Sequence, residues 1–364
     1  MQSDLIDRLA VVLTDSEVKH IAELREVKPP EPPDPPTPPD PKPPVSTPGI
    51  TKIATGRGHE YSTMYPGNAD HRWLLLQHAD GFLDLVQTDG SLVRTLPAQI
   101  NTGSQPRWSR KNPTCFWFLY LNEVRLYDVA ADKASTLRKF DQMATVNGMG
   151  ESDISEDDDH VVLCDGGHVF VYEISSDKIV TEFQAPGAFD SLYLTPKNEP
   201  VIGVYETGTH VFENGRLKNL TPSIGHMDVS STRDGRSVLV RTNAADKTGV
   251  PDGCGNGIEL VDTATGVRTC LLSLDWKLAV HVSSPDRAEF ALVSTYAPGD
   301  PNSPVKYANE LLKVMLDGSG VTSLGKHGAG TVPFTYEGTC RAAISPDGTH
   351  FVYDSQGDVY LGVL

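Results

Sequence analysis

Histidines, arginines and carboxylates fall at equivalent places in successive copies of a repeat in this sequence. Aligning the copies puts these side chains near the start of the first strand expected in each copy. Groups of this kind, converging from separate copies, are able to bind a divalent metal, an acidic sugar or another polar ligand. The competing interpretation is that polar side chains lining a channel satisfy one another and bound water. The candidate residues are Arg107, Glu151, Asp153, His226, Asp228, His281 and Arg341.

The repeat that positions these residues runs from about Ile50 to Leu364 and is written seven times. The clearest copy is Arg341–Leu364, which reads as a short strand, a Ser-Pro-Asp-Gly turn, an apolar strand, a Gly-Asp turn and a third strand. Helical periodicity is nearly absent after residue 50. Repeats of roughly 40 to 50 residues with several strands each are typical of propeller blades. The sequence therefore predicts an all-β, seven-bladed β-propeller over residues 50–364, with the innermost strands around a central channel.

Two features of the ring follow from this pattern. Ile50–Thr55 reads as a strand without a blade, and we expect it to become the outer strand of the last blade, beside Asp358–Val363. This closure would hide an otherwise exposed sheet edge. Insertions at Asn243–Asn256 and Ala297–Tyr307 lengthen the fifth and sixth copies. They predict loops on one rim that shape a binding face.

The chain before the repeat divides into two parts. Residues 1–27 predict two short helices, the second opened by the capping box Thr14–Glu17, with apolar stripes too narrow to fold alone. This segment is expected to oligomerise or to hold another protein; a frayed tail is the alternative. Residues 28–49 are rich in proline and predict a polyproline II stalk of roughly 60 Å. A ligand for a proline-binding domain is the other interpretation of the stalk.

Composition limits the partners. The formal net charge of −17 argues against nucleic acid and against a non-specific hold on anionic membranes. There is no run of eighteen apolar residues, so no membrane span is expected. The start of the chain, Met1–Arg8, lacks the basic and apolar regions of a secretory signal. The protein then stays inside the cell, has lost a signal, or reaches the exterior by another route such as virion assembly.

Cysteine and tryptophan add smaller expectations. Cys115 and Cys164 lie in apolar strands and are expected to be buried thiols. Cys254 and Cys270 flank one expected hairpin, so a disulfide between them is a candidate, although the odd total of five makes an all-disulfide scaffold unsuitable. Most of the four tryptophans should be core, while one on the rim could stack on a sugar.

The Ser-Pro-Asp-Gly blades resemble those of TolB-type propellers and of the oligogalacturonate lyase family, over residues 50–364 and mainly in the blade pattern. In that lyase family a histidine-rich channel site holds a divalent metal, usually manganese, and a basic residue removes a sugar proton. The resemblance implies His226 and His281 as metal ligand or base, and Arg341 or Arg107 as the partner of a substrate carboxylate. The family's last blade carries a Gln-x-x-His-x-His run, where this chain has Gly338–Ala343 instead.

Three functions remain in view. The sequence favours a non-catalytic binding or adhesion head, carried on the proline stalk as part of a virion fibre or cell-surface appendage, that recognises a glycan or a protein. Residues 1–48 would hold it in that assembly. The second function is a metal-dependent lyase or hydrolase acting on acidic polysaccharide, with a divalent metal in the channel. The third is an intracellular interaction scaffold.

Overall fold

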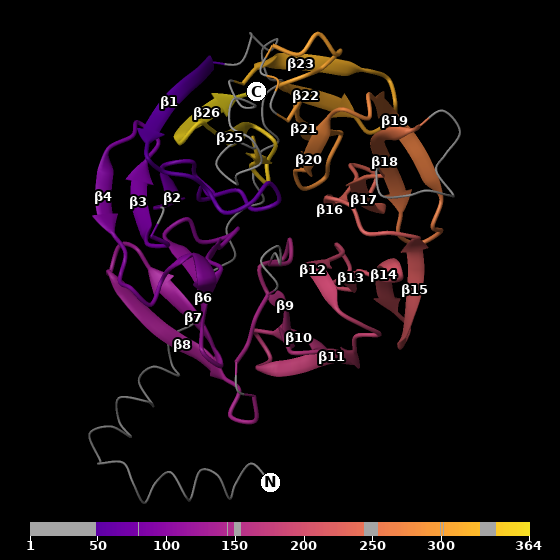
Figure 1. Cartoon of the computed structure of the whole chain (residues 1–364). Helices are drawn as coiled ribbons and strands as arrows, with labels where there is room; N and C mark the ends of the chain where they lie inside the picture. The colour runs from indigo at the N-terminus through magenta and orange to yellow at the C-terminus, as the bar shows by residue number, and fades with distance from the viewer. Residues whose placement is uncertain are drawn as a thin grey trace, which may run out of the picture. The chain divides into compact units, whose positions relative to one another are not determined.

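A computed structural model describes residues 49–78, 80–143, 145–148, 154–243, 254–298, 300, 302–327 and 340–364. Over these residues the chain forms seven antiparallel sheets, arranged as the blades of a ring (Figure 1). The expected all-β, seven-bladed propeller is confirmed. The helices expected in residues 1–27 and the stalk expected up to residue 48 lie outside the described residues, as do Glu151 and Asp153.

Five blades contain four strands each, and in four of these the strands follow sequence order from the channel outward. The second blade is β5 (Arg107–Trp108), β6 (Cys115–Tyr120), β7 (Glu123–Asp128) and β8 (Lys133–Lys139). The fourth blade is β12 (Phe189–Leu194), β13 (Pro200–Val204), β14 (Gly208–Glu213) and β15 (Arg216–Thr221). The fifth blade is β16 (Met227–Ser231), β17 (Ser237–Thr242), β18 (Asn256–Asp262) and β19 (Arg268–Leu274). The sixth blade is β20 (Ala279–Ser283), β21 (Phe290–Tyr296), β22 (Glu310–Met315) and β23 (Val321–Lys326).

In two blades the innermost position is held by isolated bridges instead of a regular strand. The first blade is β2 (Trp73–Gln77), β3 (Leu83–Gln87) and β4 (Leu92–Thr95), followed by the short 3₁₀ helix η1 (Thr102–Ser104). The third blade is β9 (His160–Asp165), β10 (His168–Glu173) and β11 (Lys178–Gln184). Bridges from Gly58 to Gln77 and from Asn147 to Cys164 stand where an inner strand would pair. The inner edge of the first blade is therefore irregular, and Figure 1 shows its chain reaching toward the middle of the ring.

The seventh blade joins the two ends of the propeller. It contains β24 (Ala342–Ile344), β25 (His350–Ser355), β26 (Asp358–Val363) and β1 (Gly49–Thr55), with β1 at the outer edge. β1 pairs antiparallel with β26, from Gly49 opposite Val363 to Thr55 opposite Asp358. Lys52 Nζ lies 2.7 Å from a carboxylate oxygen of Asp358. The closure expected from the sequence is confirmed.

The Ser-Pro-Asp-Gly sequence forms a tight turn between the first and second strands of a blade. In the seventh blade the Ser345 hydroxyl accepts a hydrogen bond from the His350 amide at 2.9 Å, and the Gly348 amide donates to the Ser345 carbonyl at 2.9 Å. Gly348 has φ of +70°, a conformation that glycine adopts without steric cost. Thr232 and Gly235 repeat this geometry in the fifth blade. The turn residues therefore recur because they satisfy the backbone there.

Apolar side chains pack between neighbouring blades. At the joint of the seventh and first blades, Leu74 and Leu76 of β2 pack with Val352 of β25 and Val359 of β26, all fully buried. Burial of each such side chain contributes about 1.5–3 kcal/mol. The ring is thus held by a core at each joint, and the polar residues of the inner strands are left to the channel.

The strand register defines two faces of the ring. The entry face is the one at which inner strands begin, next to His226 and Arg341; the turn face carries the Ser-Pro-Asp-Gly turns. Because Met227 pairs with Arg241 and Ala279 with Tyr296, the two long connections after β17 and β21 leave the ring at the entry face. Residues 244–253, 299 and 301 of the two expected insertions lie outside the described residues, so the binding rim stays a prediction.

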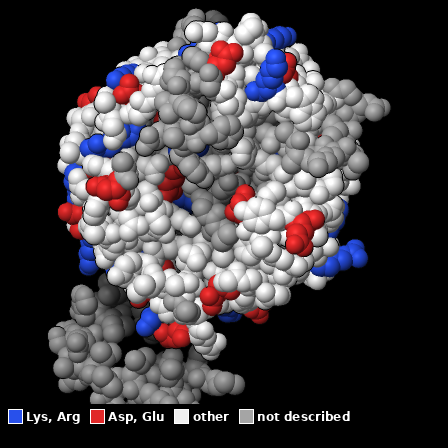
Figure 2. Space-filling model, viewed as in Figure 1, with Lys and Arg blue, Asp and Glu red and all other residues white. Residues whose placement is uncertain are grey.

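On the face seen in Figure 2, charged side chains are spread out rather than gathered in a basic groove. Figure 2 shows Asp and Glu side chains scattered over the viewed face and around its central hollow, with Lys and Arg mostly toward the periphery. This face offers no basic field for a phosphate backbone. No helix in the described part of the chain is long and apolar enough to cross a membrane.

Candidate functional site

Two predicted site residues meet at the entry face. His226 directly precedes β16 and His281 lies within β20, and their rings stack with centroids 4.3 Å apart and 12° between the planes. His226 Nδ1 lies 2.6 Å from the Val280 carbonyl oxygen, which fixes the ring. Tyr61 from the first blade presents its edge to both rings, with centroid distances of 6.4 Å and 5.8 Å. Side chains of three blades therefore converge at the channel mouth.

The two histidines differ in their surroundings. His226 is exposed, whereas His281 is buried with 5% of its surface accessible. Burial, followed by electrostatic interaction with His226 and with Arg341, lowers the pKa of His281 well below its usual value. Nδ1 of His281 has no hydrogen-bond partner among the described residues. His281 is thus a neutral imidazole beneath the solvent-facing ring of His226.

Arg341 is fixed at the joint of the seventh and first blades. Its Nη1 donates to the Glu60 carbonyl at 2.9 Å, and its Nη2 lies 3.4 Å from a carboxylate oxygen of Asp354. The Asp354 carboxylate also accepts from the Arg341 amide at 3.2 Å. His59 Nε2 lies 2.6 Å from the Arg341 carbonyl oxygen. These contacts make Arg341 part of the wall that joins the blades.

Arg107 is paired with a carboxylate that the repeat alignment did not select. Arg107 Nη1 donates to Glu60 Oε2 at 2.9 Å, and the two side chains are 10% and 15% exposed. Burial raises the pKa of Glu60 to about 7, although the Arg107 charge and hydrogen bond act in the opposite direction. The pair therefore places a carboxyl group that exchanges a proton near neutral pH in the wall of the ring.

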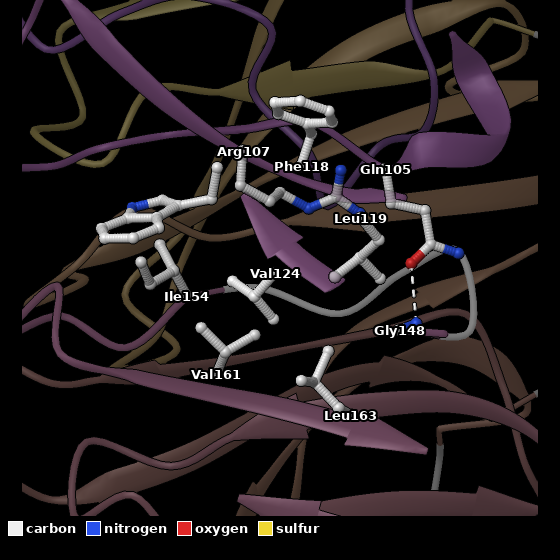
Figure 3. A pocket seen from close by; sticks show the side chains of 10 residues that line it. Gln105, Arg107, Phe118, Leu119, Val124, Gly148, Ile154, Val161 and Leu163 are labelled. Carbon is white, nitrogen blue, oxygen red and sulfur yellow. Dashed lines mark hydrogen bonds between the residues drawn. The ribbon is translucent and has the colours of Figure 1, made fainter. Parts of the chain in front are cut away.

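A small cavity lies beside Arg107, between the second and third blades (Figure 3). Its lining is mainly apolar, including Phe118, Leu119 and Val161. The Gln105 side-chain oxygen accepts a hydrogen bond from the Gly148 amide at 2.8 Å across one side. The cavity volume is ≈ 30 Å³. This is about the room that one water needs, so the cavity cannot hold a sugar.

Asp228 lies away from the histidine pair. Its carboxylate accepts from the Ser284 amide at 2.6 Å and from the Val229 amide at 2.9 Å, so it ties the fifth blade to the sixth. It borders a second cavity of ≈ 20 Å³ that is also lined by Arg110 and Asp286. Asp228 thus serves the contact between blades below the mouth.

The histidine pair does not have the donor set of a metal centre in the described part of the chain. No third His, Cys, Asp or Glu side chain there comes close enough to join His226 and His281 as a ligand. The Nδ1 atom of His226 is already held by a carbonyl oxygen. Manganese prefers several oxygen donors in an octahedral arrangement. The histidine pair therefore does not fit such an ion.

Two further buried groups complete this region and were not selected from the sequence. His327, at the end of β23, is 2% exposed, and its Nε2 lies 2.7 Å from the Thr295 carbonyl oxygen. Burial lowers the pKa of His327 to about 4. The buried Cys340 thiol precedes Arg341, and burial raises its pKa well above the usual value. Both residues lie in connections that lack the repeated pattern, so alignment of the copies could not match them to equivalent positions in other blades.

An exposed aromatic side chain stands on the same face. Trp276 is 64% exposed on the turn between β19 and β20. The Asn256 side chain donates to the carbonyls at both ends of this turn, Asp275 at 2.8 Å and Leu278 at 3.1 Å. Cys254 and Cys270 form a disulfide with a Cα–Cα distance of 5.4 Å, which decides between the two states left open by the sequence. Trp276 is thus an exposed ring on a tied turn.

Comparison with known proteins places the fold. No protein-family model matches the sequence, and no curated protein sequence matches it. A solved oligogalacturonate lyase in complex with manganese matches at a TM-score of 0.61 with 12% identity, covering 86% of this chain and 93% of that one. An oligogalacturonate lyase from Vibrio parahaemolyticus matches at 0.61 with 10% identity, covering 86% and 93%. The Pan2 WD40 domain of Neurospora crassa matches at 0.59 with 11% identity, covering 88% and 96%.

At such identities the likeness shows the fold alone. It confirms the resemblance that the blade pattern indicated, because oligogalacturonate lyases are among the structural neighbours. A WD40 domain matches almost equally well, so the likeness is one of propeller fold.

Proposed function

We propose that this protein is a non-catalytic binding head that recognises a glycan at its entry face. The observation that carries the proposal is Trp276, an exposed indole on a turn tied at both ends by Asn256. A flat apolar ring that is already held in place loses little conformational freedom on binding, and it matches the apolar face of a pyranose. His226 lies on the same face and would supply a polar contact beside the indole.

The state of the polar side chains supports binding over catalysis. Arg341 is engaged with Asp354 and with a backbone carbonyl, and Arg107 with Glu60. An arginine that clamps a substrate carboxylate would have to leave these buried partners, at a cost of several kcal/mol. The arginines therefore support the ring, and recognition falls to the exposed groups of the entry face.

The arrangement of the chain supports display outside the cell. The proline-rich residues 28–49 would hold the propeller away from whatever residues 1–27 grip, as in a virion fibre or a cell-surface appendage. The disulfide between Cys254 and Cys270 favours an oxidising environment over the interior of a cell. The same observation disfavours an intracellular scaffold.

The test of glycan binding is an array of neutral and uronate-bearing oligosaccharides, probed with the full-length protein and two variants. Trp276→Ala removes the exposed ring and is expected to weaken binding about tenfold, the effect of losing one aromatic stacking contact. Val267→Ala is the matched control, because Val267 is 61% exposed on a turn at the other end of the same blade. Absence of any bound glycan, or equal binding by both variants, would overturn the proposal.

The attachment part is tested separately. Light scattering of the full-length chain, together with recovery of partners by residues 1–48, is expected to reveal an oligomer or a larger assembly. A monomeric protein with no recovered partner would contradict the proposal that residues 1–48 attach the propeller to a larger assembly.

A lyase acting on acidic polysaccharide, which the sequence analysis expects to be metal-dependent, is the second candidate; the observation that favours it is the near-neutral pKa of Glu60 beside Arg107. Its test is the appearance of unsaturated product from polygalacturonate with added manganese. Product formation that Glu60→Gln abolishes would establish this candidate and refute the non-catalytic head.

A further inference from the structure

A group of metal-ligating side chains lies on the opposite, turn face of the ring, away from the channel histidines. Asp347 sits in the turn between β24 and β25, and His350 is the first residue of β25. His71 comes from the connection that leads into β2 of the first blade. The three residues therefore face one another across the joint at which the last blade meets the first.

Their geometry brings nitrogen and oxygen donors together. One ligand atom from each of the three side chains lies within 4.8 Å of the other two. His71 Nε2 is 3.0 Å from Asp347 Oδ2, and the rings of His71 and His350 stack with centroids 3.8 Å apart. His71 has 17% of its side chain exposed and Asp347 has 51%. The group is accessible to an ion from solvent.

Neighbouring hydroxyls support the ligand atoms from outside. The Thr349 hydroxyl lies 2.8 Å from His350 Nδ1 and 2.8 Å from both oxygens of Asp347. The Tyr65 hydroxyl lies 3.4 Å from His71 Nδ1. Histidine ligands of metals usually bond an oxygen through the second ring nitrogen, which orients the ring. Tyr65 is placed to do this while His71 Nε2 turns toward the ion.

The third and fourth blades provide an internal comparison. His160 and Asp157 hold the same turn positions as His350 and Asp347, and Asn198 of the next blade occupies the place of His71. Asn198 and His71 both have a left-handed backbone, with φ of +62° and +56°. The Asn198 amide bonds both His160 Nδ1, at 3.0 Å, and Asp157 Oδ2, at 3.2 Å. At this position the amide of Asn198 completes a hydrogen-bonded contact between blades, whereas the imidazole of His71 supplies a further nitrogen donor for a metal ion.

We propose that His71, Asp347 and His350 bind one divalent transition-metal ion of the zinc type at the closure of the ring. Two imidazoles and one carboxylate are a donor set that zinc and its borderline neighbours accept, with water in the remaining position. The ion would link residues at opposite ends of the propeller sequence. Because the ligands come together only in the folded ring, binding would stabilise the closed state. The role is structural, and it is separate from glycan binding at the entry face.

The test uses full-length protein stripped of metal and titrated with Zn²⁺, read by calorimetry and by thermal unfolding. The wild-type chain is expected to bind one zinc with a Kd in or below the micromolar range and to melt a few degrees higher when saturated. Co²⁺ in place of zinc should give the visible absorption of a nitrogen- and oxygen-ligated site.

Two variants test whether the histidines of this group bind the zinc ion. His71→Asn places at this joint the residue found at position 198, so it tolerates the left-handed backbone and should fold. His350→Ala removes the second imidazole. Both are expected to lose the zinc-dependent rise in melting temperature and to weaken binding at least about tenfold. Metal-free melting of each variant checks that it folds.

Two controls exclude other histidines. His160→Ala removes the equivalent imidazole of the third blade, and His226→Ala removes the exposed one at the channel mouth; both should bind zinc as the wild type does. Zinc binding that survives both His71→Asn and His350→Ala, or that is absent from the wild type, would overturn the proposal.

Discussion

Arg107 donates from Nη1 to Glu60 Oε2 at 2.9 Å, and this pair links the inner edges of the first and second blades. Burial nevertheless raises the pKa of Glu60 to about 7. The folded protein therefore holds a proton on Glu60 between about pH 4.5 and 7 that the unfolded chain releases. Stability from this group is present at pH 5 and is lost as the pH rises through 7.

Glu60→Gln tests this linkage, because glutamine is a neutral copy of the protonated acid. The variant should match the wild type at pH 5 and exceed it at pH 8 by on the order of 2–3 kcal/mol in the free energy of unfolding. Urea unfolding at both pH values measures this. Glu206→Gln, at an exposed position in the turn between β13 and β14, gives the background from a change in net charge. A stability difference that does not vary with pH would contradict the assignment.

His327 acts in the opposite direction. Burial lowers its pKa to about 4, so between about pH 4 and 6.5 the unfolded chain binds a proton that the folded chain does not. Stability from this group is present above pH 6.5 and is lost as the pH falls toward 4. His327→Gln should flatten the acid limb of the stability curve by up to about 3 kcal/mol.

Melting temperatures between pH 7 and pH 4 measure that slope. Lys178→Gln, an exposed change on β11, serves as the control for added amides at the surface. If His327→Gln and the control lose stability in parallel on acidification, His327 is not the responsible group.

The blades could be predicted from the sequence because each carries its own local signals. β2 (Trp73–Gln77) and β3 (Leu83–Gln87) are short apolar runs separated by turn residues, which is the local pattern that defines each copy of the repeat. The last blade could be recognised because its turn, Ser345–Gly348, makes hydrogen bonds to its own backbone groups and so has a typical sequence. The exact strand ends depend on the local backbone: β6 ends at Tyr120, because Leu121 takes the left-handed conformation of a turn.

The candidate site was predictable only in part. Alignment of the copies placed His226 and His281 near the start of two neighbouring inner strands, and the regular pairing of β16 and β20 brings the two rings together although they are three positions apart in register. Glu60 escaped because the first blade has an irregular inner edge, where the register is not defined by pairing. His71 and His350 escaped because their contact crosses from the last copy to the first, and no repeat alignment compares those two ends.

The disulfide between Cys254 and Cys270 gives a test that needs no ligand. It closes a loop with a sequence separation of 16 residues across the β18–β19 hairpin. Loop-closure entropy predicts that its loss costs about 3 kcal/mol. Reduction of the disulfide, or replacement of both cysteines by serine, should lower the melting temperature. Loss of the bond should also weaken glycan binding, because the chain next to Cys254 lies beside the Trp276 side chain.

Cys115, Cys164 and Cys340 are buried free thiols, so thiol counting under native conditions should find little reactivity before reduction. A melting temperature that is the same in oxidised and reduced protein would mean that the bond contributes nothing to the fold.

The ring is closed by β1, which forms the outer edge of the seventh blade although it comes first in the sequence. Ile53 of β1 is buried against the joint with the first blade, and Lys52 pairs with Asp358. A chain that begins at residue 57 would expose the whole edge of β26 and lose these contacts. We expect its melting temperature to fall by roughly 10 °C or more relative to a chain that begins at residue 49, which keeps β1. Because the two chains differ by eight residues only, the comparison isolates β1 from the preceding segment. Equal melting temperatures of the two chains would show that the apolar core between the seventh and first blades closes the propeller without β1.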